Sequence, residues 1–234
     1  YDYAGDFSEG YASIQMGMLW GYIDKTGKEI IQLQYQSTQA FKGGLAIIKS
    51  GEKYGYIDPA GKIIIPLKYD FATMFAEGLA LVKLDEKSLY IDKNGTEVLA
   101  TDYAWLGNLS EGLAPFSLND KQGYIDKTGR VIIPPKFDNA GYFSEGLACD
   151  KIGGKFGYID KTGKQVIEAK FDDARSFSEG MAEVKTGGKW GFIDKTGKEV
   201  IPAVYDYVGA FHEGLARVEK NRKSGFVDKT GKGM

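Results

Sequence analysis

The stretch "KWGFIDKTGKEVIPAVYD", residues 189–206, has the pattern of a β-hairpin. Apolar residues lie on both sides of "DKTG", whose Asp and Gly are typical of a tight turn. The chain writes this pattern repeatedly, as "GYIDKTGKEIIQLQYQ" from Gly21, "GYIDPAGKIIIPLKYD" from Gly55 and "GYIDKTGRVIIPPKFD" from Gly123. Such repetition is typical of a protein built from tandem structural repeats. The sequence therefore predicts the fold more closely than the biochemical role.

Three landmarks recur with a spacing of 34 residues or a multiple of it. The glycine before "YID" or "FID" occurs six times, with Leu89 in the remaining place: Gly21, Gly55, Gly123, Gly157, Gly191 and Gly225. The glycine of "EGLA" occurs seven times: Gly10, Gly44, Gly78, Gly112, Gly146, Gly180 and Gly214. An aromatic residue does so too: Tyr1, Tyr35, Tyr69, Tyr103, Phe137, Phe171 and Tyr205. The chain therefore holds about seven repeats without an insertion.

Residue pattern, rather than period, decides the fold class, because helical tetratricopeptide repeats also have 34 residues. Each repeat is rich in Gly, Ile, Val, Tyr and Phe, and its apolar residues alternate as in strands. We predict three strands per repeat, roughly at 45–50, 54–58 and 62–66 in the second copy. An irregular link, "YDxAxxFxEG", is expected to follow them.

The "DxxG" turn is expected to close the hairpin in every copy. Asp at the first position accepts a backbone hydrogen bond, and Gly at the fourth tolerates a left-handed conformation. Calcium binding is the alternative, but one carboxylate per turn makes a poor calcium loop. The predicted structural turn residues are Asp24, Gly27, Asp58, Gly61, Asp92, Gly95, Asp126, Gly129, Asp160, Gly163, Asp194, Gly197, Asp228 and Gly231.

Composition excludes several classes of protein. The 234 residues are 43% hydrophobic and 13% aromatic, which is enough for a core, and the net charge is −2 without a basic stripe. Nucleic acid and anionic membrane surfaces are therefore poor candidate partners. No apolar run is long enough to span a membrane, and a single cysteine permits no internal disulfide. The sequence begins at Tyr1 without a signal peptide, so it is interpreted as a mature or excised segment.

Gly–aromatic–Ile–Asp–x–x–Gly–Lys, preceded by Trp20 or Trp190 and followed by "EGLA", resembles the bacterial WG (KWG) β-repeat. The resemblance covers essentially the whole chain, although Trp is replaced in five copies and Leu89 replaces the glycine in the third. The family has no common enzymatic activity, so the resemblance implies a scaffold or binding module. It also slightly favours the bacterial cell envelope or secretion over other locations.

Comparison of the copies argues against a catalytic site. His212, the only histidine, shares its slot with Ser, Lys and Ala, and Cys149 shares its slot with Ser, Ile, Leu, Pro, Glu and Arg. Both slots are interpreted as permissive, and no nucleophile, base or metal cluster is evident. We therefore expect no enzyme activity, no cofactor and no metal. The Glu of "EGLA", present in six copies, is expected to bind backbone amides at a loop.

One variable slot holds the candidate contact residues. It is occupied by Trp20, Tyr54, Ser88, Gln122, Phe156, Trp190 and Ser224, and is expected to be half exposed because Gln and Ser are accepted. These rings, together with Trp105, could stack on sugars or pack on a partner protein. The alternative is that each ring covers its own hairpin against the next repeat.

We predict an all-β fold, a single domain over 1–234 made of seven antiparallel units in an open solenoid, with a seven-bladed propeller as the alternative. Thirty-four residues are few for a four-stranded propeller blade, and too few residues follow Gly231 to complete a ring with Tyr1. The predicted function is a non-enzymatic scaffold that binds another protein. A glycan or cell-wall binding module is the second hypothesis, and an enzyme with a site at one end of the array is the third.

Overall fold

Every regular element of the protein is a β-strand. The computed structural model describes residues 1–233, and within them the strands form seven antiparallel sheets without a helix. The chain forms two compact bodies. One contains Tyr1–Tyr103 with Lys127–Gly129, and the other contains Ala104–Asp126 and the chain from Arg130 onward. The predicted all-β tandem array of seven repeats is thereby confirmed.

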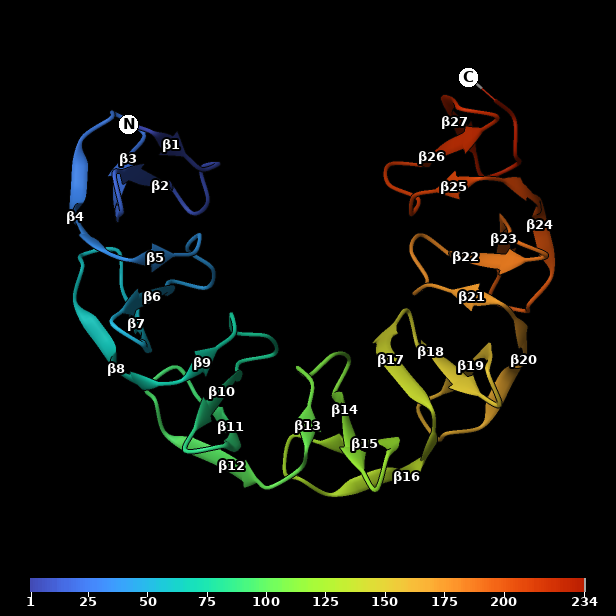
Figure 1. Ribbon diagram of the computed structural model, residues 1–234, viewed down its shortest axis with the longest axis horizontal. Helices are drawn as coiled ribbons and strands as arrows, with labels where there is room; N and C mark the ends of the chain where they lie inside the picture. The colour runs from blue at the N-terminus through green and yellow to red at the C-terminus, as the bar shows by residue number, and fades with distance from the viewer. Residues whose placement is uncertain (234) are drawn as a thin grey trace. The chain divides into compact units, whose positions relative to one another are not determined.

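The N-terminal body holds the first three sheets, which follow one another along the chain (Figure 1). Sheet 1 consists of β1 (Tyr3–Ala4), β2 (Tyr11–Met16), β3 (Leu19–Asp24) and β4 (Glu29–Tyr35). Sheet 2 consists of β5 (Ser37–Thr38), β6 (Ala46–Ser50), β7 (Lys53–Ile57) and β8 (Ile63–Tyr69). Sheet 3 consists of β9 (Phe71–Ala72), β10 (Ala80–Leu84), β11 (Lys87–Ile91) and β12 (Glu97–Thr101).

The C-terminal body holds the other four sheets. Sheet 4 consists of β13 (Trp105–Leu106), β14 (Leu113–Leu118), β15 (Lys121–Asp126) and β16 (Val131–Phe137). Sheet 5 consists of β17 (Asn139–Ser144), β18 (Leu147–Ile152), β19 (Lys155–Asp160) and β20 (Gln165–Phe171). Sheet 6 consists of β21 (Asp173–Ala174), β22 (Met181–Thr186), β23 (Lys189–Asp194) and β24 (Glu199–Tyr205). Sheet 7 consists of β25 (Tyr207–Val208), β26 (Leu215–Lys220) and β27 (Lys223–Asp228).

The link between hairpins is more regular than predicted. The three predicted strands of the second copy are β6, β7 and β8, but the link also contributes a short first strand to each sheet. In Figure 1, β4 leads almost directly into β5, which opens the next sheet. A two-residue strand is enough to complete a four-stranded sheet. The argument that 34 residues are few for four strands was therefore wrong.

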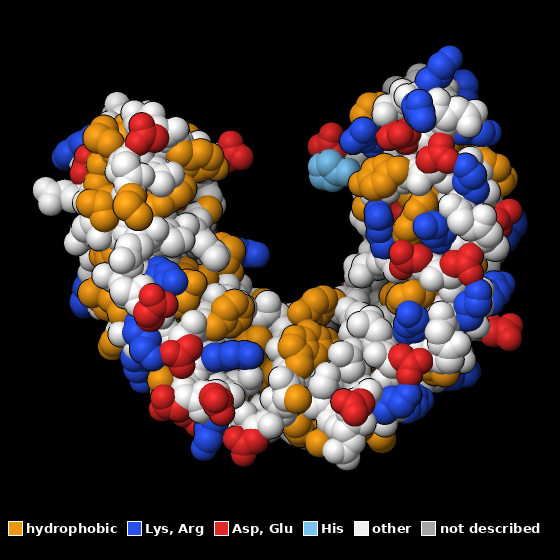
Figure 2. All heavy atoms as spheres, in the orientation of Figure 1, with side chains coloured by type: hydrophobic (Ala, Val, Ile, Leu, Met, Phe, Trp, Pro, Cys, Tyr) orange, Lys and Arg blue, Asp and Glu red, His pale blue; other side chains and the backbone are white. Residues whose placement is uncertain are grey.

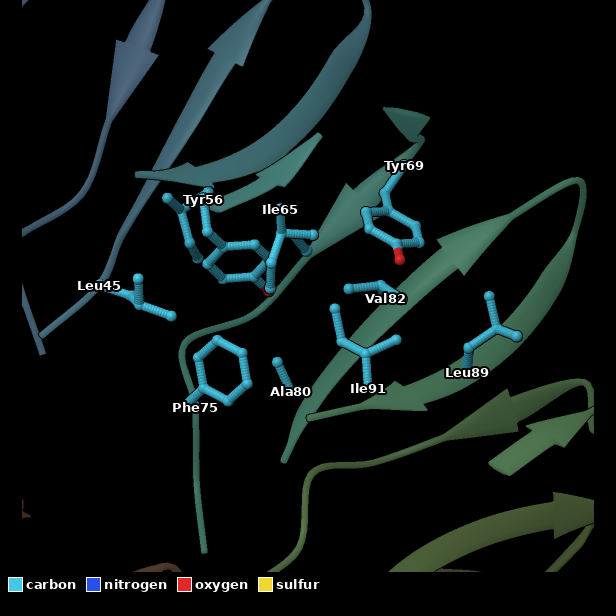
Figure 3. Packing of buried hydrophobic residues seen from close by; sticks show 11 residues of the cluster. Leu45, Tyr56, Ile65, Tyr69, Phe75, Ala80, Val82, Leu89 and Ile91 are labelled. Carbon is cyan, nitrogen blue, oxygen red and sulfur yellow. The ribbon is translucent and has the colours of Figure 1, made fainter. Parts of the chain in front are cut away.

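The core lies between consecutive sheets within each body. Figure 3 shows one such cluster, in which Leu45, Tyr56 and Ile65 of repeat 2 pack against Phe75 and further residues of sheet 3. Three equivalent clusters join sheets 4 to 5, 5 to 6 and 6 to 7, and another joins sheets 1 and 2. A single repeat cannot bury both faces of its sheet, so stability comes from these interfaces.

In sheets 1, 2, 4 and 5 a tyrosine contacts the following repeat both by packing and by a hydrogen bond. The Tyr158 ring contacts the Phe177 ring at 4.9 Å between centroids, and its hydroxyl donates to the Arg175 carbonyl at 2.7 Å. Tyr22, Tyr56 and Tyr124 make the same hydroxyl bond to the residue seventeen positions on. These hydroxyls can be buried without a large loss of stability because each donates a hydrogen bond to a backbone carbonyl.

The "DxxG" turns combine a side-chain bond with a left-handed glycine. Asp160 Oδ1 accepts hydrogen bonds from Thr162 N at 2.9 Å and Lys164 N at 3.1 Å, while Gly163 has φ 81°. A Cβ on Gly163 would lie 2.9 Å from Ile133 Cγ2 of the preceding repeat. A Cβ on Gly27, in the first repeat, would meet no atom within 4 Å. This glycine is thus a turn residue everywhere, and from the second repeat on it also touches the preceding sheet.

The "EGLA" glutamate connects one repeat to the next by hydrogen bonds from its carboxylate. Glu9 accepts hydrogen bonds from the N–H groups of Gly43 at 2.6 Å and Gly44 at 2.9 Å, which lie in the next repeat. In the C-terminal body, Glu145 accepts from Gly180 N at 3.0 Å and pairs with Lys195 at 3.1 Å. Amide binding at a loop is the role expected for this residue from the copies alone.

The third repeat differs from the others in its strand pairing, and Leu89 stands where they have the strand glycine. In the other four-stranded sheets the strand glycine faces a bulge in the fourth strand: a Cβ on Gly157 would lie 2.6 Å from the Ile167 carbonyl oxygen. In sheet 3, β11 and β12 pair without that bulge from Ser88 to Tyr90, so Leu89 has room and is buried. The replacement therefore changes the local strand pairing and leaves the hairpin intact.

Candidate functional site

Strand register gathers the candidate contact residues into one cross-strand row in each sheet. In sheet 6 the row is Asp173, Lys185, Trp190 and Tyr205, each residue paired with its neighbour. Trp105 stands in the first-strand place of the sheet 4 row, whereas Trp20, Tyr54, Phe156 and Trp190 stand in the third-strand place. We call these sets the aromatic rows. They bring together two slots that the sequence alone had kept apart.

Each aromatic row carries a ring in its first-strand or third-strand place. Where the third-strand place holds Ser88, Gln122 or Ser224, the first-strand place holds an aromatic residue. Where the third-strand place is aromatic, the first-strand residue is Ser37, Asn139 or Asp173. Only sheet 1 has a ring in both of these places, Tyr3 and Trp20, whose centroids are 5.4 Å apart. The rings of the first-strand place are Tyr3, Phe71, Trp105 and Tyr207.

Exposure separates the two places. The first-strand rings are all exposed, with Trp105 at 37% and Phe71 at 43%. In the third-strand place Trp20, Tyr54, Gln122 and Phe156 are half-buried, as expected. Ser88 and Trp190 are buried, so the expectation of half exposure was wrong for them. Ser88 belongs to the row whose first-strand ring is Phe71.

Cations lie over three of the third-strand rings, whereas the row of Trp20 has Gln15 in the corresponding place. Lys49 Nζ lies 5.3 Å from the centroid of the Tyr54 ring, and Lys151 Nζ lies 5.1 Å from that of Phe156. Trp190 has the Arg175 guanidinium at 4.6 Å and Lys185 Nζ at 5.7 Å. These contacts favour the interpretation in which each third-strand ring covers its own hairpin. Among the exposed first-strand rings Tyr207 has Arg175 at 5.6 Å and Arg217 at 5.9 Å, so Phe71 and Trp105 are the better candidates for contact with a ligand or partner.

An open pocket of about 360 Å³ lies at the aromatic row of sheet 4. Trp105 forms part of its wall, and Leu118, Asp120, Gln122 and Asp138 contribute to its lining. Gln122 is held in place, because its Oε1 accepts from Ala140 N at 2.6 Å and its Nε2 donates to Ser117 Oγ at 3.2 Å. Asp138 pairs with Lys121 at 2.5 Å, and this ion pair holds the pKa of Asp138 below its ordinary value.

Two carboxylates are buried in the C-terminal body. Asp150 is fully buried in β18, in a slot that holds Ile, Val or Phe in every other repeat, and neither oxygen has a hydrogen-bond partner. Burial raises its pKa to about 6, against the influence of Lys136. Glu183 is also buried, but Arg175 lies 3.7 Å from it. Cys149 shares this environment, and burial raises the pKa of its thiol to about 12.

The residues that catalysis would need do not converge. His212 is exposed beside the "EGLA" turn of repeat 7, and Cys149 lies in a different sheet. Among residues 1–233 no group of three or more His, Cys, Asp and Glu side chains could hold a metal ion. Figure 2 shows basic and acidic side chains interspersed over the face in view. Metal independence and the absence of activity remain predictions.

A β-repeat protein stabilised by contacts between successive sheets is the class that this fold and these rows define. The family described as "WG containing repeat" matches residues 1–17, 20–54, 54–87, 90–121, 123–156, 156–190 and 190–223. The chain belongs to this family. No curated protein matches the sequence. Within the described residues 1–233, no helix exists that is long and apolar enough to cross a membrane.

Several solved structures share the fold at low sequence identity. A structure titled "Crystal structure of the eukaryotic initiation factor" has a TM-score of 0.65 and 11% identity over 99% of this chain and 76% of that one. Hsv2 from Kluyveromyces lactis has a TM-score of 0.53 and 12% identity over 80% and 70%. Dihydro-heme d1 dehydrogenase NirN has a TM-score of 0.56 and 14% identity over 99% and 65%. The likeness to Hsv2 fits the propeller alternative, and the choice between an open array and a propeller stays a prediction.

Proposed function

We propose that the protein is a non-enzymatic binding module whose exposed first-strand rings contact another protein. The observation that carries this proposal concerns the position of the aromatic residue in each row. Rows that lack a ring on the third strand have one on the first strand. Three rows without a third-strand ring have an exposed ring on the first strand instead, namely Phe71, Trp105 and Tyr207. Exposed aromatic residues are enriched in protein interfaces because they bury a large area with few rotatable bonds.

The repeat supports this role by fixing the strands that bear the rings. Hydrogen bonds to the "EGLA" glutamates and from the tyrosine hydroxyls join one sheet to the next within each body. A rigid scaffold reduces the entropy that is lost when a partner binds. The partner is proposed to be a protein, with neither nucleic acid nor a membrane surface involved, because charges of both signs are evenly distributed along the sequence.

Site-specific photo-crosslinking tests the proposal in cells that express the full chain. We would place a photoreactive phenylalanine analogue at Trp105 or, as a control, at Val131. Val131 lies on β16, at the opposite edge of sheet 4, and is 43% exposed against 37% for Trp105. We expect a protein adduct of defined mass from position 105 and none from 131. Equal adducts from both positions, or adducts with glycans alone, would contradict the proposal.

A further inference from the structure

The pocket at Trp105 is opened by several departures from the repeat that occur together. The second-strand place of the aromatic row holds Gln, Lys or Glu in six repeats but Ser117 in the fourth. The third-strand place holds Gln122 where four repeats have a large ring, and Ala104 stands where five repeats have Asp. All three residues line the pocket. In most other repeats longer side chains at these three positions would fill the space. In the fourth repeat all three are replaced by smaller or less bulky residues, which leaves the pocket open.

The missing lysine indicates what the pocket would accept. In sheets 2 and 5, the row's own lysine lies 5.3 Å from the Tyr54 centroid and 5.1 Å from the Phe156 centroid. In sheet 4 the residue directly opposite Trp105 is Ser117, which supplies no cation. Trp binds cations through its ring face more strongly than Tyr or Phe does. Those lysines lie over third-strand rings, whereas Trp105 is an exposed first-strand ring whose own row of Ser117, Gln122 and Phe137 contains no cation. Its ring face can therefore receive a cation from a ligand.

Charge around the pocket is complementary to a cation. Asp138 is neutralised by Lys121 at 2.5 Å, but Asp120 of the β14–β15 turn has no ion pair in the described structure. Leu118, which is 45% exposed, gives the pocket an apolar wall. A long side chain with a cationic head matches this lining, because its aliphatic stem can lie on Leu118 while its head meets Trp105 and Asp120.

We propose that this pocket binds an arginine or lysine side chain of the partner protein. The inference rests on the proposed protein-binding function and names the chemistry of one contact. A sugar fits less well, because both the amide oxygen and the amide nitrogen of Gln122 are already bonded within the protein. Gln122 is therefore less available to a sugar hydroxyl.

The three tryptophans provide a direct assay. Indole N–H resonances of Trp20, Trp105 and Trp190 would be followed in ¹H–¹⁵N spectra of the full chain during titration with N-acetyl-arginine amide. We expect a saturable shift of the Trp105 resonance, while Trp20 and Trp190, whose rings are contacted by Tyr3 and by Arg175, stay in place. The citrulline analogue, which has nearly the same shape without the charge, should bind about tenfold more weakly.

Two variants test the assignment of residues. Ser117→Lys returns the residue type that repeats 2, 3, 5 and 6 carry, so we expect it to fold normally and to abolish the arginine-induced shift. Asp120→Asn should weaken binding several-fold, because Asn keeps the left-handed φ of 59° and removes the charge. Glu52→Gln, in the corresponding turn of sheet 2, is the matched control and should change nothing.

The inference fails if arginine and citrulline amides shift Trp105 equally, if all three indoles move together, or if Ser117→Lys binds like the parent. A shift of Trp105 by N-acetylglucosamine oligomers without one by arginine amide would replace it with glycan binding. Each of these results concerns the pocket alone. The proposed protein-binding function is tested separately by the crosslinking at position 105.

Discussion

Replacing Asp150 tests how the interface between sheets 4 and 5 tolerates a buried charge. The pKa of this carboxyl is raised from 3.8 to about 6 by burial, although Lys136 acts in the opposite direction. A difference of about two pKa units corresponds to about 3 kcal/mol between the two protonation states. Since the ordinary, lower value holds in the unfolded chain, ionisation of Asp150 destabilises the fold.

The sign of the pH dependence follows directly. The cost is absent below the unfolded pKa of 3.8, grows as pH rises toward the folded pKa of about 6, and is complete above it. Asp150→Asn should therefore raise the free energy of unfolding by about 2–3 kcal/mol near pH 8 and by about 1 kcal/mol near pH 4.5. Asp150→Val, which restores the residue of Val82 and Val184, should add a gain that does not depend on pH.

Urea denaturation of the parent and both variants at the two pH values would measure these differences. Groups that titrate elsewhere affect all three proteins alike, so they cancel from the comparison. The reasoning is refuted if Asp150→Asn is no more stable than the parent near pH 8. A gain of the same size at both pH values would also refute it, because the buried carboxylate would then not be the cause.

Four further predictions concern the repeat and its rows. Gly163→Ala should cost more than Gly27→Ala in thermal unfolding, by about 1–3 kcal/mol, because both glycines have φ near 80° but only Gly163 faces Ile133. An Ile133→Ala background should remove that excess, and equal costs would contradict the contact. Glu145→Ala should lower stability by about 1–2 kcal/mol through loss of the Gly180 and Lys195 contacts, whereas Glu213→Ala should have little effect in the same melts, because the Glu213 side chain makes neither kind of contact within residues 1–233. Trp190→Ala should destabilise the fold by about 3–5 kcal/mol, because its ring is buried, whereas Trp105→Ala should leave the melting temperature nearly unchanged and weaken binding of the captured partner in a pull-down. Chelator treatment should leave the circular dichroism melt in place, and a loss restored by calcium would revive the calcium interpretation of the "DxxG" turns.

The sequence predicted the repeat, its strands and its turn chemistry because these depend on local pattern. Alternation marks the strands of each repeat, and the spacing of Asp24 and Gly27 marks the turn. The short first strand was missed because two residues such as Phe71 and Ala72 show no alternation. Strand register was needed to see that Phe71 and Ser88 belong to one row, since the two lie in different slots of the repeat.

Variation among the copies proved a poor guide to exposure. The slot of Cys149 holds seven residue types, yet Cys149 and Glu183 are buried in it, the latter beside Arg175. The slot of Asp150 is otherwise apolar, so the copies themselves contained the signal of an unusual residue there. Comparing slots identifies such a residue, but only packing shows whether a neighbour such as Arg175 compensates it.

The segments that match the family have a consequence for how such chains change length. Residues 20–54 and 156–190 run from the third strand of one sheet into the third strand of the next. Each segment thus contains both sides of a junction, including the bonds from Tyr22 to Gln39 and from Tyr158 to Arg175. The junction also uses residues outside the segment, such as Leu147 and Ile193 in the cluster between sheets 5 and 6. A duplication or deletion of one segment therefore adds or removes most of one junction and joins the first two strands of one sheet to the last two strands of another.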